Sequence, residues 1–281
     1  MKEYRSVKAS ELTTMRCGGT IDILYEPETQ GELQALVTGL ERYVLIGAGS
    51  NLIFPDGLIT TPVIRLGAAF SSVEPAPGGI RAGGAAPLAR VLDFCRKNAL
   101  AGLEFLSGIP GTVGGALCMN AGTAETGIME RLIEAEYVDC RGVHSAARES
   151  LPYRYRSGGF DDGAIIVSAL LMAHSDSADK ITSAMRAYLD RRKNQPGGFS
   201  CGSVFKNPPG QAAGRLIEQA GLKGFRIGGA AVSEVHANFI INEGNATSAD
   251  IRSLVRAVKE RVKDRFGIEL EEEVKILDER L

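Results

Sequence analysis

The chain has 281 residues, 44% of them hydrophobic and 23% charged, a balance typical of a soluble globular protein and unlike that of a disordered one. Its length suggests two or three domains. Because 32 basic side chains are balanced by 34 acidic ones, for a formal charge of −2, no basic patch indicates a nucleic-acid or membrane-surface partner.

The chain also lacks the signals of export and of metal binding. No apolar core follows its first charges, so no signal peptide is expected, and no apolar run is long enough to span a bilayer. The five cysteines form no CxxC pair and the three histidines lie far apart, so we expect neither a disulfide framework nor a metal site. These features favour a cytoplasmic protein.

The first part of the chain has the strand–helix–strand pattern of an α/β unit. We expect a strand over residues 21–25 and a helix that begins at Thr29, because Glu32 occupies the capping-box position three residues later. A short buried strand over 43–46 then runs directly into the turn Gly47–Asn51.

This turn fails two phosphate-binding fingerprints. Position 52, where the third glycine of a dinucleotide-binding motif belongs, is Leu52, and Pro55 prevents a long helix from following. No Gly-Lys-Ser/Thr occurs, which excludes a P-loop. A strand that ends in a tight turn, with Ser50 and Asn51 as extra donors, still suits a pyrophosphate; the alternative is an ordinary turn.

The glycine-rich run over 108–122 is the most informative stretch. Glycine loses much backbone freedom in a regular element, so we expect neither a helix interior nor a central strand here. Such a backbone can instead approach a flat or anionic ligand closely. The alternative is a flexible linker, which the interleaved Ile109, Val113 and Leu117 disfavour because they require burial.

The remaining elements follow from hydrophobic periodicity and end signals. Asn194–Gly198 is the clearest domain boundary. Before it we expect strands over 63–66, 79–84, 132–138 and 164–171, a helix from Pro87 to Asn98, and an amphipathic helix over 178–192. After it we expect a strand over 200–208, a helix that ends before Gly221, a long helix between Thr247 and Gly267, and a final strand over 269–277.

Together these stretches resemble the UDP-N-acetylenolpyruvoylglucosamine reductase family, flavoenzymes of peptidoglycan precursor synthesis. Each matching stretch is weak alone, but their order over nearly the whole chain is specific. They comprise residues 14–19, 47–52, 102–105 continuing into 108–122, 155–156, 202–208, 221–224, 233 with 236–242, and 270–274.

The resemblance implies an α/β and α+β architecture: the vanillyl-alcohol-oxidase-like (PCMH-type) FAD-binding fold of two α/β subdomains, with a smaller C-terminal α+β domain for the substrate. We place FAD-binding subdomain 1 at 1–68, joined by a returning C-terminal strand over 267–281. Subdomain 2 then covers 69–193 and the substrate-binding domain covers 194–266.

The resemblance also implies FAD, bound non-covalently because no His or Cys stands at a covalent-flavin position, with NADPH as co-substrate. Both glycine turns also allow the close backbone approach that such a cofactor requires. The expected cofactor contacts are Gly47, Ala48, Gly49, Ser50, Asn51 and Leu52 in the first turn, and Pro110, Gly111, Thr112, Gly114, Gly115 and Asn120 in the second.

The implied reaction passes hydride from flavin N5 to the enolpyruvyl ether of UDP-N-acetylglucosamine and yields UDP-N-acetylmuramate. The resulting enolate needs positive charge beside its carboxylate and a proton donor beside its carbon. Arg156 suits the first role, because a guanidinium binds a carboxylate bidentately. The family implies Ser203 as the proton donor and Glu273 as the third catalytic residue; for Glu273 alone the alternative is a solvated strand end.

Three residues are expected to bind substrate: Tyr155, Lys206 and Asn207. Because Tyr153-Arg154 duplicates the dipeptide, the register is open; we prefer Arg156, which puts Phe160 where the family has an aromatic residue. The alternative is a solvated hairpin tip.

Two further expectations concern neighbouring segments. Arg191-Arg192 follows Arg156 too closely for a substrate-capping tyrosine loop, so we expect the family branch without that loop. On a strand, Cys201 and Ser203 would face the same way, so Cys201 either lines the pocket or is a buried spectator.

No second nucleotide module is visible, so NADPH and the sugar nucleotide are expected to use one site in turn, with ping-pong kinetics. The alternatives are another FAD-dependent dehydrogenase or oxidase on the same fold, and a catalytically silent nucleotide-sugar binding protein.

Overall fold

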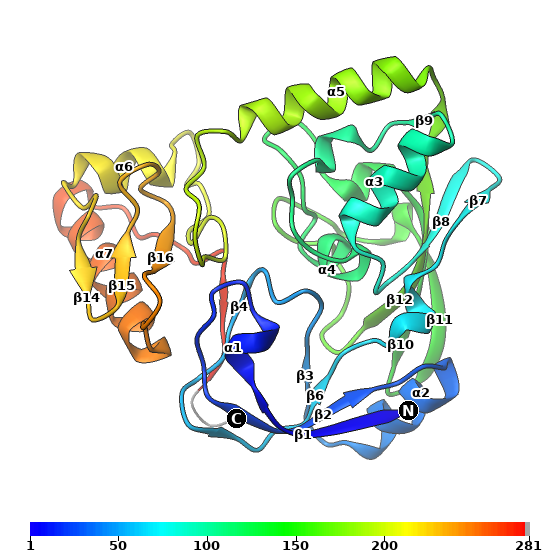
Figure 1. Cartoon of the computed structure of the whole chain (residues 1–281), viewed down its shortest axis with the longest axis horizontal. Coiled ribbons are helices and arrows are strands. Elements are labelled where there is room, and N and C mark those ends of the chain that lie inside the picture. Colours follow the sequence, from blue (N-terminus) through cyan, green and yellow to red (C-terminus); the bar gives the residue numbers. More distant parts are fainter. Residues whose placement is uncertain (279–281) are drawn as a thin grey trace. The chain divides into compact units, whose positions relative to one another are not determined.

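The computed structural model describes residues 1–278, which form two compact units (Figure 1). Unit 1 contains residues 1–3, 24–48 and 63–193, and unit 2 contains 4–23, 49–62 and the chain from Asn194 onward. One of the divisions between the units falls between Lys193 and Asn194.

Residues 1–68 contribute to both units. Strand β2 (Thr20–Glu26) pairs through Thr20 and Ile21 with β5 (Leu58–Ile59) in unit 2, and through Leu24 and Tyr25 with β6 (Val63–Ile64) in unit 1. The segment is thus shared between the two units. The returning segment from residue 267 belongs to unit 2, and residues 279–281 of it lie outside the described part of the chain. The three-part functional division stays a prediction.

Unit 1 is built on an antiparallel sheet covered on both faces (Figure 1). Ile165 and Val167 of β12 pack with α2 (Gln30–Gly39), whereas Ile166 packs on the other face with α3 (Leu88–Lys97) and α4 (Val113–Cys118). Coverage of both faces explains why β12 is apolar along most of its length. The strand order is β11 (Gly142–Ala147), β10 (Leu132–Asp139), β12 (Ile165–Met172), β8 (Gly79–Gly83) and β7 (Val73–Ala76).

The other elements of unit 1 are helix α5 (Ala178–Arg191), which contacts α3, and several short pieces. The short strands are β3 (Val44–Leu45), β9 (Leu100–Ala101) and β13 (His174–Ser175), and the 3-10 turns are η1 (Ala68–Ser71), η2 (Glu104–Leu106), η3 (Ile128–Arg131) and η4 (Arg148–Ser150).

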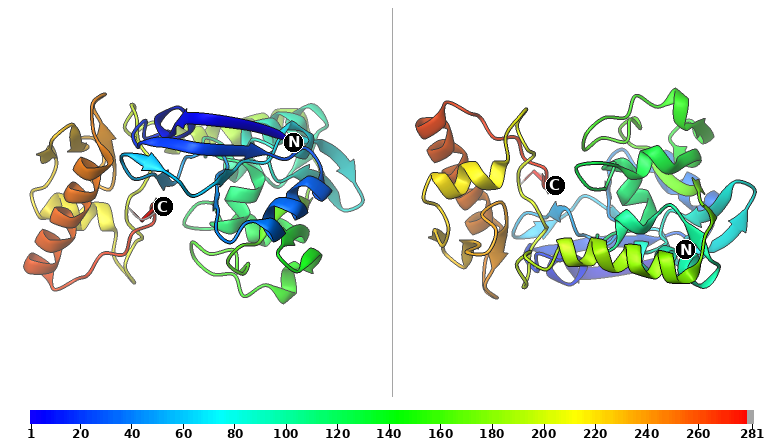
Figure 2. Two further views of the ribbon diagram at one scale, coloured as in Figure 1. Left: turned by 90° about the horizontal axis from the view of Figure 1, so that it is seen from below. Right: turned by 90° about the horizontal axis from the view of Figure 1, so that it is seen from above.

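Unit 2 buries one apolar core between a small sheet and two helices. Strands β14 (Arg226–Ile227), β15 (Ala230–Val232) and β16 (Ile240–Asn242) are antiparallel, and helix α7 (Ser248–Phe266) contacts both this sheet and α6 (Ala213–Gln219) (Figure 2). Its other elements are β1 (Lys2–Lys8), which begins in unit 1, α1 (Ala9–Leu12), and the parallel pair β4 (Leu52–Ile53) and β17 (Lys275–Ile276).

The predicted helix ends are confirmed where capping chemistry defines them. Thr29 caps α2 by accepting from the Glu32 N–H at 3.2 Å, and Asn98 is the C-cap of α3. Thr247 and Asp250 form a complete capping box on α7, and Gly267 ends it with a φ of 69°. None of the described helices is both long and apolar enough to cross a membrane.

Three expectations about elements are wrong. The glycine-rich run contains a helix, α4, with Gly114 and Gly115 in its first turn. Residues 200–208 make single bridges, such as Ser203 with Phe239, rather than a strand, because Gly202 interrupts the extended backbone with a φ of +73°. The C-terminal segment is regular only over β17 rather than over 269–277.

Candidate functional site

The two glycine turns expected to bind the cofactor lie side by side. A Cβ added to Gly47 would stand 2.7 Å from the Thr112 hydroxyl oxygen, so the first turn packs against the residue that caps α4. Gly49 has a φ of +63°, and its Cα packs against the Leu12 backbone: an added Cβ would come within 2.0 Å of the Leu12 carbonyl oxygen. Only glycine fits at Gly49.

These turns present backbone donors that the protein does not use. Among the described residues, the N–H groups of Gly47, Ala48, Gly49, Gly111 and Thr112 have no hydrogen-bond acceptor. Gly49 is also buried, and buried N–H groups are nearly always paired. A row of unused N–H groups at two adjacent turns fits an anionic group such as a pyrophosphate.

Helix α4 has one glycine for packing and one that faces open space. Val113 and Gly114 donate to the Ala86 and Gly84 carbonyl oxygens, and a Cβ on Gly114 would lie 3.1 Å from Gly84 O. Gly115 is exposed, and a Cβ there would meet only the Thr112 hydroxyl at 3.5 Å. Of these two glycines, only Gly115 leaves its face open.

Asn120 has a structural use that its sequence position does not reveal. Its Nδ2 donates to the Arg154 carbonyl at 3.1 Å, and its Oδ1 accepts from the Met129 N–H at 3.2 Å. The Gly158 N–H also donates to the carbonyl of Cys118 at 2.9 Å, so the end of α4 holds the turn that carries Tyr155 and Arg156.

Tyr155 and Arg156 form the tip of that turn. Arg154 and Ser157 exchange backbone hydrogen bonds at 2.9 and 3.0 Å, which leaves a two-residue loop. Arg156 has a φ of +57°, an uncommon conformation for a residue with a side chain, and its guanidinium lies 5.0 Å from the centroid of the Tyr155 ring. Arg156 is half-buried and Arg154 is exposed, which favours the Arg156 register.

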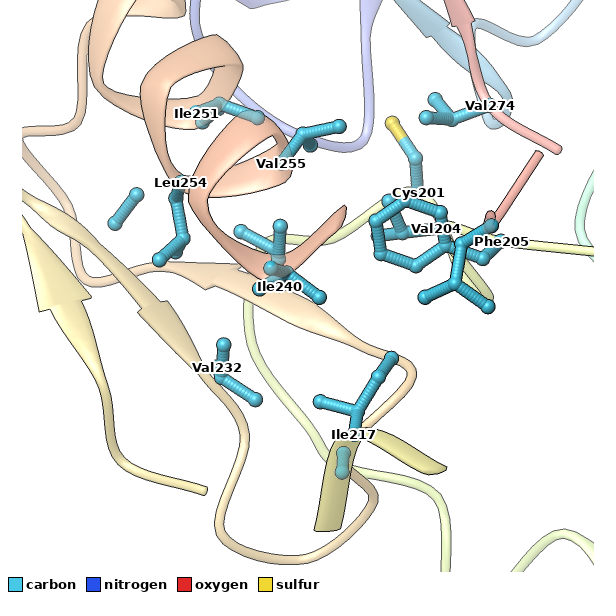
Figure 3. Packing of buried hydrophobic residues seen from close by; sticks show 14 of the residues in the cluster. Cys201, Val204, Phe205, Ile217, Val232, Ile240, Ile251, Leu254, Val255 and Val274 are labelled. Atoms are coloured by element: carbon cyan, nitrogen blue, oxygen red, sulfur yellow. The ribbon is translucent and has the colours of Figure 1, made fainter. Parts of the chain in front are cut away.

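In unit 2 the chain brings Ser203 and Glu273 to neighbouring segments that are joined by backbone hydrogen bonds. The Glu273 N–H donates to the Val204 carbonyl at 2.7 Å, directly after Ser203. Val204 and Val274 belong to the buried core (Figure 3), whereas Ser203 and Glu273 are half-buried. Two residues 70 positions apart in sequence therefore lie beside each other at the edge of one core.

The first glycine turn connects directly to this segment. Asn51 donates from Nδ2 to the Glu273 carbonyl at 3.0 Å, and its own carbonyl accepts from the Lys275 N–H at 3.0 Å. Leu52 begins β4, which pairs with β17. Asn51 and Leu52 thus attach the C-terminal segment to the turn, besides any contact they make with a cofactor.

Lys206 and Asn207, expected to bind substrate, both have protein partners. Lys206 forms an ion pair with Glu271, and its N–H donates to the Glu271 carbonyl at 2.8 Å. The Asn207 Oδ1 accepts from the Ala213 N–H at 3.0 Å, at the start of α6. Their substrate contacts stay predictions.

Cys201 lies in the core of unit 2 (Figure 3). It is 5% exposed, and burial raises the pKa of its thiol to about 11. Cys201 and Ser203 do not share the face of a strand, contrary to expectation, because Gly202 interrupts the extended backbone between them. The structure favours the buried-spectator interpretation.

Two residues that received no role from the sequence hold the Ser203 segment. The Thr14 N–H donates to the Gly49 carbonyl at 3.1 Å, and its hydroxyl donates to the Ser200 carbonyl at 2.6 Å. The Asn238 side chain binds the backbone of Phe205. Both lie in stretches that carry the family resemblance, which was the only signal available for them.

Comparison with known proteins settles the family. A model of the FAD binding domain matches residues 21–148, and one of the C-terminal domain of UDP-N-acetylenolpyruvoylglucosamine reductase matches 194–277. The reductase of that name from Geobacter sulfurreducens is 43% identical, covering 94% of this chain and 90% of its own. The chain belongs to the UDP-N-acetylenolpyruvoylglucosamine reductase family.

Other members agree with this assignment. UDP-N-acetylenolpyruvoylglucosamine reductase 1 of Bacillus anthracis is 39% identical over 94% of this chain and 91% of its own. The crystal structure of the Thermus caldophilus enzyme superposes with a TM-score of 0.89 at 36% identity, covering 99% of this chain and all of the other. The expected FAD-binding fold is thereby confirmed, and the chain is an FAD-dependent oxidoreductase of this reductase family.

Proposed function

We propose that this chain reduces UDP-N-acetylenolpyruvoylglucosamine to UDP-N-acetylmuramate for peptidoglycan synthesis, with non-covalent FAD as cofactor and NADPH as reductant. The substrate is that of the family to which the chain belongs. The structural observation that carries the mechanism is the backbone hydrogen bond between Glu273 and Val204, which sets Glu273 beside Ser203.

The chain's own residues fit FAD. The unused N–H groups of Gly47, Ala48 and Gly49 in the first turn, and of Gly111 and Thr112 in the second, would hold its pyrophosphate. The open face at Gly115 would let the backbone approach the cofactor closely. When bound and reduced, FAD supplies hydride to the vinyl carbon of the substrate.

Arg156 is assigned to the substrate carboxylate. Hydride addition leaves negative charge spread from the inner carbon into that carboxylate, and a guanidinium placed there stabilises the charge as it develops. The left-handed turn at Arg156 supports this role, because backbone strain of this kind concentrates at functional sites. Tyr155, in contact with the guanidinium, would restrict its orientation.

Ser203 is assigned as the proton donor to the inner carbon. A hydroxyl is a weak acid, but a carbanion is a strong base, so transfer from Oγ is downhill once the carbanion forms. Glu273, beside Ser203, is assigned one of two roles: it donates a hydrogen bond to the substrate carboxylate, or it pairs with Arg156. Lys206 would stabilise the serine alkoxide, in competition with its ion pair to Glu271.

NADPH and the sugar nucleotide are proposed to occupy one site in turn, which gives parallel initial-rate lines; intersecting lines would contradict the shared site. The cytoplasmic location and the family branch without the tyrosine loop stay predictions. Another flavin dehydrogenase on this fold, or a silent binder, would not consume NADPH and the enolpyruvyl substrate together.

The variant Ser203→Ala tests the mechanism by separating the two half-reactions. NADPH should still bleach the flavin at the wild-type rate, while reoxidation by the enolpyruvyl substrate should slow by about 100-fold or more, as expected for loss of a general acid. Ser200→Ala is the control, because the Ser200 side chain makes no hydrogen bond with residues 1–278 and its carbonyl, which accepts from Thr14, is kept. Loss of the NADPH half-reaction in Ser203→Ala would show that Ser203 has a different function.

A further inference from the structure

Arg192, which follows the last residue of α5, lies across the start of the glycine-rich run. A Cβ added to Gly108 would stand 2.8 Å from Cδ of Arg192 and 3.6 Å from its Nε. Gly108 therefore leaves the space through which the Arg192 stem passes. The side chain is half-buried, unlike those of its neighbours Arg191 and Lys193, which are exposed.

Among residues 1–278 no carboxylate neutralises the charge of Arg192. Its guanidinium makes no ion pair and no hydrogen bond with any residue between 1 and 278. The pKa of Arg192 is lowered by burial and by the nearby positive charge of Arg156. Its neighbours differ, because Arg191 pairs with Glu125 at 3.2 Å and Lys193 pairs with Asp190 at 2.6 Å.

A partly buried cation beside a like charge, with no carboxylate partner, is unfavourable for the ligand-free protein. Such an arrangement is found where a ligand supplies the missing negative charge. The Arg192 stem lies against Gly108, and its charge is close enough to that of Arg156 to lower the Arg192 pKa, so it lies within electrostatic reach of the turn that we assign to the substrate.

We propose that Arg192 is an anion-binding residue of the substrate site, which contacts an anionic oxygen group of the sugar nucleotide alongside Arg156. The proposal rests on the function proposed above. The group is either the carboxylate or the diphosphate, since both offer oxygen pairs that a guanidinium binds bidentately.

The test compares Arg192→Gln with its matched control, Arg191→Gln. Each holoenzyme is titrated separately with UDP-N-acetylmuramate and with UDP-N-acetylglucosamine, and binding is followed by flavin absorbance. Arg192→Gln should weaken binding of UDP-N-acetylmuramate roughly 10- to 100-fold, as for loss of a charge-assisted hydrogen bond. Arg192→Lys should recover part of the affinity, and Arg191→Gln should bind like the wild type. Equal losses for both ligands identify the diphosphate, and a loss confined to UDP-N-acetylmuramate identifies the carboxylate.

Two more readouts separate binding from a structural role. Apoprotein of Arg192→Gln should unfold at the wild-type temperature or higher, since an unpaired charge has been removed, and should bind FAD within twofold of wild type. A fall in unfolding temperature, a loss confined to FAD affinity, or sugar-nucleotide binding equal to that of Arg191→Gln would each overturn the proposal. Failure of the wild-type protein itself to bind UDP-N-acetylmuramate would instead count against the proposed function.

Discussion

The side-chain amide of Asn238 makes both hydrogen bonds to Phe205 that a neighbouring strand would make. Its Nδ2 donates to the Phe205 carbonyl at 2.8 Å, and its Oδ1 accepts from the Phe205 N–H at 3.0 Å. The backbone carbonyl of Asn238 also accepts from the Val204 N–H at 2.8 Å. Asn238 thus holds the segment that presents Ser203, where Gly202 prevents a regular strand.

Asn238→Leu should therefore destabilise the protein substantially. The residue is 4% exposed, and an apolar side chain would leave the N–H and C=O of Phe205 buried and unpaired. We expect a loss of about 2–4 kcal/mol in the free energy of unfolding, measured by urea denaturation. Asn194→Leu, at an exposed position, is the control and should change the value little. Equal stability of the two variants would contradict the assigned role.

The two neighbouring glycines of α4 should respond oppositely to alanine. Gly114→Ala should lower stability by about 1 kcal/mol or more, because its Cβ would lie 3.1 Å from Gly84 O and 3.3 Å from Ile166 O. Gly115→Ala should leave stability unchanged or raise it by up to about 1 kcal/mol, since alanine favours helix. The same Gly115 change should weaken FAD binding roughly tenfold or more, because the methyl group occupies the face where the backbone approaches the cofactor.

The FAD affinity of each variant is measured by reconstituting its apoprotein with FAD. The stability of each variant is measured by thermal unfolding. If Gly115→Ala bound FAD as tightly as the wild type, α4 would not be part of the proposed cofactor site; the description of the fold would be unaffected.

Thiol reactivity should distinguish Cys140 from the buried cysteines. Cys140 is exposed, whereas burial raises the pKa of Cys201 to about 11 and that of Cys95 to about 12. Because only the thiolate reacts, iodoacetamide at pH 8 should modify Cys140 first and leave Cys201 and Cys95 intact, as read by mass spectrometry. The protein modified at Cys140 should keep its reductase activity. Rapid modification of Cys201 in the folded protein would show that it lines an open pocket.

Asp139 should make the free energy of unfolding depend on pH in the acidic range. The guanidinium of Arg141 and, less strongly, His144 at 2.9 Å hold the pKa of this carboxyl well below its usual range. A lowered folded-state pKa stabilises the fold above the unfolded pKa of about 3.9, and this contribution is lost as the pH falls further. Asp139→Asn should therefore be less stable than wild type at pH 7, and the difference should shrink below pH ~4.

Asp161→Asn is the matched control for this measurement. Asp161 also faces Arg141, at 3.5 Å, but its side chain is 79% exposed, so its loss should have little effect at either pH. A difference between Asp139→Asn and wild type that stayed constant from pH 7 to pH 3 would contradict the assigned cause.

The candidate site was only partly accessible from the sequence. Both glycine turns could be identified locally, because glycine spacing signals close backbone approach. Ser203 and Glu273 came from the family resemblance, since nothing in either local stretch reveals that Glu273 bonds to Val204. Arg192 looked like an ordinary helix-terminal charge, and its lack of a carboxylate partner among residues 1–278 is a property of the folded chain.

The sequence by itself determined the helix ends at Thr29, Asn98 and Gly267, because capping depends on residues a few positions apart. It also determined which segments are buried, through hydrophobic periodicity. Only the tertiary structure decided that glycines could enter helix α4, where Gly114 fits against Gly84, and that residues 200–208 would be held by Asn238 instead of by a strand. The physical reason is that these outcomes depend on contacts between distant parts of the chain, which local propensity does not encode.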